Sequence, residues 1–172
     1  NSVLHSIPDC QSIIKKAAVE RLKEKYHNSW FEETGAVFPI QFSIIKDEVI
    51  IYLDTTGTGL HKRGYRRNSN DAPIKETLAA GIVDLARVRG DSVVCDPFCG
   101  SGTLLIESAY KALSVAPGLK RRFLAEKWDS VPSSFWKDAR NDAISLVRHD
   151  TAFKAIGYDI DENAVTLTNE NA

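Results

Sequence analysis

Several features that would assign a class at once are scarce in this sequence. Its 172 residues contain no methionine, three cysteines and four histidines, and the formal net charge is −1. The cysteines form no C-x-x-C pair and are odd in number, which argues against a cysteine metal site and a disulfide framework. The histidines show no metal-ligand spacing. No apolar run approaches the roughly 20 residues that cross a bilayer, and no signal segment opens the chain. We therefore expect a globular cytoplasmic protein without a bound metal.

The lack of methionine, even at position 1, concerns the extent of the chain. It leads us to expect either a fragment of a longer protein or a chain from which methionines are missing. A chain of 172 residues has room for one domain or for parts of two.

The first third of the chain has the pattern of one helix and one hairpin. Apolar residues recur at helical spacing from 9 to 26, and Asp9, after Pro8, is the expected cap. Two strand-like runs, 37–45 and 49–53, are joined by a polar turn. Because one helix and two strands bury little surface, we expect this unit to be the end of a larger domain.

Helices and strands alternate in the rest of the chain, which is typical of an α/β fold with a parallel sheet. A helix is predicted from a cap at Asp71 and Pro73 to a stop at Gly90. Strands are predicted at 93–95 and 155–159, helices at 104–113 and 162–172, and an insertion at 117–150 with its own helix at about 134–148. The first helix is expected to bury the stripe Ile74, Leu78, Ile82 and Leu85.

The run DPFCGSGT, residues 96–103, joins the first of these strands to its helix. Glycines there let the backbone pass close to a ligand, and the helix N-terminus offers unpaired N–H groups. Leu105 replaces the third glycine of a dinucleotide fingerprint, and no Lys-Ser/Thr pair of a P-loop follows. An acid at 96 would repel a pyrophosphate but suits a cationic ligand with a single carboxylate. S-adenosylmethionine has this chemistry; the alternative is an ordinary tight turn capped by Asp96.

A second acid, Asp159, ends the second predicted strand. In a doubly wound sheet ligands bind at the carboxyl ends of neighbouring strands, so Asp159 is expected to accept the ribose hydroxyls. It lies 57 residues beyond Gly102, far more than the roughly 20 of a dinucleotide site. The difference calls for a family that carries an insertion here.

Residues 55–75 hold five Lys or Arg and one Asp, between two mildly acidic stretches. Within them, HKRGYRR at 61–67 places a tyrosine among cations. Cations beside a stackable ring suit an RNA backbone and an unstacked base. The alternative is a solvated loop.

Taken together, the chain resembles the bacterial RNA methyltransferases that join a THUMP RNA-binding domain to a class I methyltransferase domain, the ribosomal-RNA guanine-N2 methyltransferases and their relatives. The resemblance covers nearly the whole chain. The segments that carry it are IPDCQ at 7–11 with KKA at 15–17, LDTTG at 53–57, LHKRGYR at 60–66, APIKE at 72–76, DPFCGSGT with Ile106 and Glu107, APG at 116–118, EKW at 126–128 and GYDID at 157–161.

The resemblance implies a fold, domains and site residues. Residues 1–54 would be the C-terminal part of an α+β THUMP-type domain, 55–71 a basic linker, and 72–172 the first half of a Rossmann-like class I methyltransferase sheet. The turn would wrap the methionine end of the cofactor and Asp159 would bind its ribose. The cofactor residues implied are Pro73, Lys75, Glu76, Asp96, Cys99, Gly100, Ser101, Gly102, Thr103 and Asp159, and the RNA-binding residues are Lys62, Arg63, Tyr65, Arg66 and Arg67.

The implied reaction is direct methyl transfer from S-adenosylmethionine to guanine N2, assisted mainly by positioning. The Asn/Asp-Pro-Pro-aromatic turn that presents the amine in this family is absent from these 172 residues, so the catalytic residues are expected elsewhere and the fragment alone is expected to be inactive. Alternatives are an RNA-binding adaptor with a non-catalytic fold, a methyltransferase of tRNA, a DNA adenine or cytosine methyltransferase and, disfavoured by Leu105 and Asp96, a nicotinamide oxidoreductase.

Overall fold

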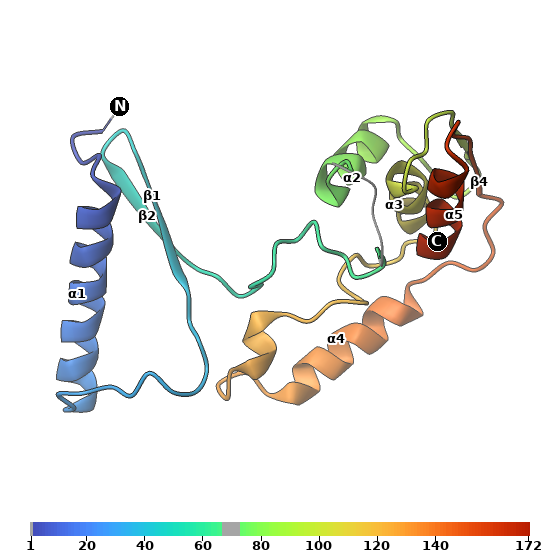
Figure 1. Cartoon of the computed structure of the whole chain (residues 1–172). Coiled ribbons are helices and arrows are strands. Elements are labelled where there is room, and N and C mark those ends of the chain that lie inside the picture. Colours follow the sequence, from blue (N-terminus) through green and yellow to red (C-terminus); the bar gives the residue numbers. More distant parts are fainter. Residues whose placement is uncertain (1, 67–72) are drawn as a thin grey trace. The chain divides into compact units, whose positions relative to one another are not determined.

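The computed structural model describes residues 2–66 and 73–172, which divide into two compact units, Asn1–Thr55 and Thr56–Ala172. We describe each unit by itself (Figure 1). The prediction of an α/β fold is confirmed for the second unit, where helices alternate with two parallel strands. No helix in the described ranges is both long and apolar enough to span a bilayer.

The first unit is helix α1 (Ile7–Tyr26) beside an antiparallel hairpin of β1 (Ile40–Ile45) and β2 (Glu48–Leu53) (Figure 1). The predicted cap at Asp9 is wrong, because α1 begins at Ile7 with Ser6 as its N-cap. Pro8 can lie in the first turn of the helix, since the N–H groups there have no hydrogen-bond partner within the helix and the lack of one on proline costs nothing. Lys46 and Asp47 both have positive φ, 52° and 64°, as a two-residue hairpin turn of matching twist requires.

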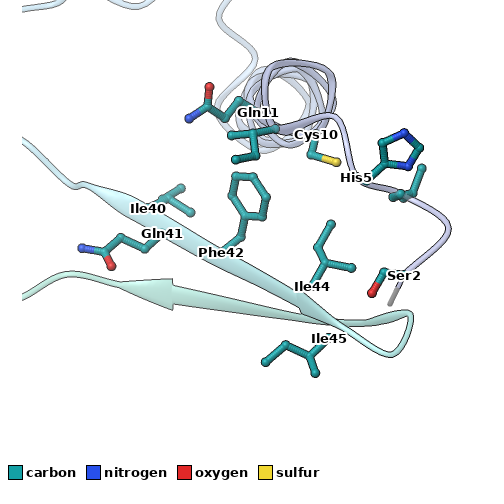
Figure 2. A pocket seen from close by; sticks show the side chains of 11 residues that line it. Ser2, His5, Cys10, Gln11, Ile40, Gln41, Phe42, Ile44 and Ile45 are labelled. Carbon is teal, nitrogen blue, oxygen red and sulfur yellow. The ribbon is translucent and has the colours of Figure 1, made fainter.

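A groove of about 760 Å³ lies between α1 and the hairpin. Figure 2 shows Cys10 from the helix and Phe42 from β1 facing one another across it, while Ile45 points to the other side of the strand. Much of the hairpin is exposed, and every residue of β2 retains solvent contact. The apolar side chains of β2 are therefore left largely uncovered by the described part of this unit.

The second unit is built around two parallel strands, β3 (Val93–Asp96) and β4 (Lys154–Gly157), with Asp96 opposite Gly157. The predicted adjacency of the two strands is therefore confirmed. Helix α3 (Thr103–Ala112) packs on both strands and on α2 (Glu76–Leu85). The insertion contains η1 (Leu124–Lys127) and α4 (Ser133–Ser145), and α5 (Glu162–Asn171) follows β4.

The predictions for α2 are partly wrong. The helix starts at Glu76 with Lys75 as its N-cap and ends at Leu85, well before Gly90, because Arg87 already takes a left-handed φ of 55°. The predicted cap, Asp71, lies outside the described residues. The buried positions are Glu76, Ala79 and Val83, whereas Leu78 and Leu85 are 59% and 86% exposed. The small side chain of Ala79 lets α2 approach α3 closely. Two faces of α2 are apolar in the sequence, and the prediction selected the one that is exposed.

Gly64 supplies a stability prediction. Its φ is +94°, and a Cβ there would lie 2.5 Å from the carbonyl oxygen of Lys120. Because the contact is with backbone and the φ is strained for other residues, we expect Gly64→Ala to lower the free energy of unfolding by at least about 2 kcal/mol. Urea unfolding of the full-length protein measures this.

Gly81, in the middle of α2, is the matched control, since a Cβ there meets nothing within 4 Å. Gly81→Ala should stabilise the protein by about 0.5–1 kcal/mol, because alanine favours a helix interior. Equal stability of the two variants would contradict the close packing of Gly64 against the backbone of Lys120.

Candidate functional site

The glycine turn between β3 and α3 depends on its left-handed backbone. Gly100 and Gly102 have φ of 52° and 78°, and Gly102 is the N-cap of α3. A Cβ on Gly102 would lie 2.8 Å from Cγ2 of Thr168 in α5. Glycine at 102 is therefore required by the packing of α5 against the turn as well as by its conformation.

The tip of β4 holds the turn through backbone and carboxylate. Tyr158 donates its N–H to the carbonyl of Asp96, and Cys99 donates to the carbonyl of Tyr158, both at 2.8 Å. Asp159 Oδ2 accepts the N–H of Gly100 at 2.9 Å, and its Oδ1 accepts the N–H of Asp161 at 3.0 Å. These N–H donors, that of Asp161 first, hold the pKa of Asp159 below its ordinary value. The carboxylate is thus ionised and fixed beside the turn.

Two polar side chains of α5 satisfy the carbonyls of the turn. Thr168 Oγ1 donates to the carbonyl of Gly100 at 2.9 Å, and Asn171 Nδ2 donates to the carbonyl of Ser101 at 3.2 Å. Asn171 is only 4% exposed. Neither residue was among the predicted site residues. The available signal was their position: with the buried Ala164 they follow one stripe of α5, where a polar residue needs a partner.

The predicted cofactor residues of the turn divide into buried and accessible groups. Cys99, Ser101 and Thr103 are buried, so their side chains pack inside the unit. Asp96 is half-buried, and its Oδ1 accepts the N–H of Phe98, whose ring is 84% exposed. The accessible side chains of this region therefore include those of Asp96, Pro97, Phe98 and Asp159.

The predicted residues before α2 have different surroundings. Pro73 and Lys75 are exposed. Glu76 is buried, and its Oε1 lies 3.1 Å from Nε of Arg66. The side chain of Glu76 therefore lies inside the unit, paired with Arg66.

The predicted role of Tyr65 as a stacking ring for RNA is corrected by its burial. Tyr65 is 4% exposed, its hydroxyl donates to Glu107 Oε1 at 3.2 Å, and its ring meets that of Tyr110 edge to face. Nε of Arg63 lies 3.4 Å from the same carboxylate oxygen. Burial raises the pKa of Glu107 although Arg63 opposes the shift. Tyr65 and Arg63 thus belong to the interior.

Of the other residues predicted to bind RNA, Lys62 is exposed, Arg66 is paired with Glu76, and Arg67 lies outside the described residues. Arg121, itself buried, holds the segment that contains Lys62. Its guanidinium donates to the carbonyls of Thr58, Gly59 and Lys62. Residues 56–66 are therefore packed into the second unit instead of forming a free linker.

The insertion is held by Glu126 and by one aromatic stack. Glu126 Oε1 accepts the N–H of Phe123 at 2.8 Å and Arg140 Nη2 at 2.6 Å, and Oε2 accepts Arg122 Nη1 at 3.0 Å. The ring of Phe123 stacks on Trp136 of α4 with centroids 5.6 Å apart. These contacts tie α4 to η1.

A largely apolar hollow of about 460 Å³ lies between α3, β4 and α5. Cys99 lines it from the turn and Gly157 from the end of β4, but neither Asp96 nor Asp159 lines it. The accessible carboxylates therefore belong to a different surface from this hollow.

The fold and the turn define a class: a methyltransferase-type α/β domain preceded by a THUMP domain. A family model described as "RMKL-like, methyltransferase domain" matches residues 63–172, and one described as "THUMP domain" matches residues 1–54. The chain belongs to the RMKL-like methyltransferase family, and the recognition made from its motifs is confirmed.

Named relatives agree with this assignment. The chain is 46% identical to "Putative RNA methyltransferase YpsC" of Bacillus subtilis, over 99% of this chain and 45% of that protein. It is 37% identical to "Ribosomal RNA large subunit methyltransferase K/L" of Shewanella pealeana, over 92% of this chain and 23% of that protein. The chain therefore spans less than half the length of these relatives.

Two solved structures share the fold. A "predicted N6-adenine-specific DNA methylase" from Listeria monocytogenes superposes with a TM-score of 0.93 at 48% identity, over 99% of this chain and 45% of that one. "SMU.472, a putative methyltransferase complexed with SAH" superposes with a TM-score of 0.88 at 39% identity, over 98% of this chain and 45% of that one.

Glu126 supplies a pH prediction. Burial opposes its ionisation, but the N–H of Phe123 and the guanidinium of Arg140 prevail and hold its pKa below the ordinary value of 4.5. A lowered folded-state pKa stabilises the fold above the unfolded pKa, and the contribution is lost as pH falls through the folded value. Glu126→Gln should therefore cost about 1–2 kcal/mol at pH 7, and the difference from wild type should shrink below about pH 4.

Urea unfolding of the full-length protein between pH 3 and pH 7 measures this difference. The control is Glu24→Gln, because Glu24 and its partner Arg21 are both exposed on α1 and such pairs contribute little. A constant difference between Glu126→Gln and wild type across this range would show that the charge of Glu126 does not stabilise the insertion.

Proposed function

We propose that this chain is part of an S-adenosylmethionine-dependent RNA methyltransferase whose target is the exocyclic N2 of guanine in ribosomal RNA. The use of S-adenosylmethionine as cofactor is supported by the ionised Asp159 carboxylate, which is fixed beside the glycine turn at the carboxyl ends of two parallel strands. RNA as the substrate is supported by the match to the THUMP domain and by relatives whose names specify RNA.

The residues present fit this cofactor. A carboxylate offers about four lone-pair sites, and backbone N–H groups occupy one on each oxygen of Asp159. Acceptor sites therefore remain for the two ribose hydroxyls. The first hydrogen bond of α3 runs from Ile106 N to the carbonyl of Gly102, so the amides before it have no partner within the helix and favour a carboxylate. Asp96, near the same turn, suits the cationic end.

When bound, S-adenosylmethionine would supply an activated methyl group on a positive sulfur. The chain's own residues bind and orient it: Asp159 holds the ribose, and the turn from Asp96 to Gly102 holds the methionine end. Fixing a donor in place in this way removes much of the entropic barrier to transfer. The groups that present guanine N2 would come from the part of the protein outside these 172 residues.

The RNA would be held mainly by the THUMP domain, with exposed Lys62 as a phosphate contact of the second unit. A guanine within a helix would have to leave the stack before its N2 could be reached. We place the activity in the cytoplasm, the compartment that the cysteine usage favours.

A second candidate target is adenine N6 of DNA, because the Listeria relative carries that description. The THUMP match favours RNA. Incubating the full-length protein with labelled S-adenosylmethionine and either ribosomal RNA, transfer RNA or DNA, followed by nucleoside analysis, separates these targets. Labelled N2-methylguanosine in ribosomal RNA is the expected product. Cofactor binding without methylation of any of them would favour a non-catalytic adaptor.

Asp159 supplies the binding prediction. In the full-length protein, Asp159→Asn should weaken binding of S-adenosylhomocysteine at least about tenfold, because a charge-assisted hydrogen bond to a hydroxyl is worth about 1.5–3 kcal/mol. Isothermal titration calorimetry measures the dissociation constant, and a thermal melt of the same sample reports the loss of the Gly100 hydrogen bond separately.

Asp161→Asn is the matched control. Asp161 is the N-cap of α5 and accepts the N–H of Asn163, a role that asparagine fills equally well. The Asp161→Asn variant should bind S-adenosylhomocysteine with the dissociation constant of the wild type. Unchanged binding in Asp159→Asn would contradict the ribose role.

A further inference from the structure

One guanidinium, that of Arg66, joins three segments next to the glycine turn. Its Nη2 donates to Thr103 Oγ1 at 2.6 Å and to the carbonyl of Ile74 at 3.4 Å, and its Nε lies 3.1 Å from Glu76 Oε1. The side chains of Arg66 and Glu76 are 14% and 8% exposed. Contacts so little exposed are screened weakly, and they fix geometry in a way that a surface ion pair does not.

The partners of Arg66 stand at the start of two helices. Glu76 is the first residue of α2, and Thr103, the first residue of α3, directly follows Gly102. A lone cation is unfavourable at a helix N-terminus, so the carboxylate of Glu76 is needed to offset it. The planar fork of arginine can hold Glu76 and Thr103 at once, which the single ammonium of lysine does much less well.

We propose that Arg66 is a positioning residue for the cofactor turn, acting through Thr103. Thr103 is buried, so its hydroxyl serves Arg66 in place of a ligand. The hydrogen bond fixes the first residue of α3, and with it the amides that follow Gly102. Asp159 and Thr168 hold the turn from β4 and α5, and Arg66 adds a third attachment, from residues 56–66. The inference rests on the proposed function, in which this turn binds S-adenosylmethionine.

A double-mutant cycle in the full-length protein tests the role, with S-adenosylhomocysteine as the titrant in calorimetry. Arg66→Lys keeps a cation beside Glu76, and Thr103→Val keeps the shape of the threonine while removing its hydroxyl. Each should weaken binding about tenfold, the size expected for losing one charge-assisted hydrogen bond. The double variant should bind no more than about twofold more weakly than either single variant, because both remove the same interaction.

Arg63→Lys is the matched control. Arg63 lies in the same segment and is as buried as Arg66, but its partner, Glu107, lies a turn further along α3. We expect a lower melting temperature with a dissociation constant within about twofold of wild type, since the altered contact is remote from the turn.

The outcomes separate the two claims. Wild-type affinity in both Arg66→Lys and Thr103→Val, with melting temperatures lowered as in Arg63→Lys, would overturn the positioning role and leave the proposed function intact. Additive losses in the double variant, about a hundredfold, would also overturn it. Failure of the wild-type protein to bind S-adenosylhomocysteine would overturn the proposed function, and the positioning role with it. If Arg66→Lys does not fold, Thr103→Val decides alone, since it leaves the Arg66–Glu76 pair in place.

Discussion

The hydrogen bonds that pair the glycine turn with β4 and α5 are the constraint on which the second unit depends. A turn without regular structure has amides and carbonyls that must find partners once they are removed from water. Here Asp159 accepts one amide, and Thr168 and Asn171 donate to two carbonyls. The close approach needs glycine: a Cβ on Gly157 would lie 2.7 Å from Cδ1 of Leu105. The residues that form the proposed cofactor surface therefore also hold the strands and helices together.

Buried charge has a comparable role in residues 56–66. Removing an ion pair from water costs more than its attraction often returns, and the raised pKa of Glu107 shows burial outweighing Arg63 at that pair. Such pairs are therefore weak evidence of stability. They do fix a geometry, since each carboxylate or carbonyl accepts its cation from a limited set of directions. Arg63, Arg66 and Arg121 together define the course of a segment that has no regular secondary structure.

The sequence predicted the local chemistry well and the distant partners poorly. The strand–turn–helix at 93–112 and the second strand could be predicted because glycine turns and apolar runs are signals within a few residues. The buried face of α2 could not be predicted, because Leu78 and Ile82 are as apolar as Ala79 and Val83. Which face is buried depends on how α2 packs against α3, and that is not visible in the sequence of α2. The basic segment was misread for the same reason: its charges are visible in the sequence, whereas Glu107, more than 40 residues away, is not recognisable as their partner.

The glycines and the acid do not identify a ligand by themselves, because the fold already requires them. A side chain at position 102 would collide with Thr168, so the packing of α5 requires glycine there. Both oxygens of Asp159 accept backbone N–H groups. Asparagine has only one such oxygen and would leave one amide unpaired. This structural role nevertheless favours binding. A carboxylate that the backbone already holds loses little conformational freedom when it accepts a hydroxyl, and preorganisation of this kind raises affinity. The structural role of Asp159 and its proposed role in ligand binding are therefore compatible. A substitution of Asp159 would lower stability through the first role alone, so affinity is the measurement that tests the second.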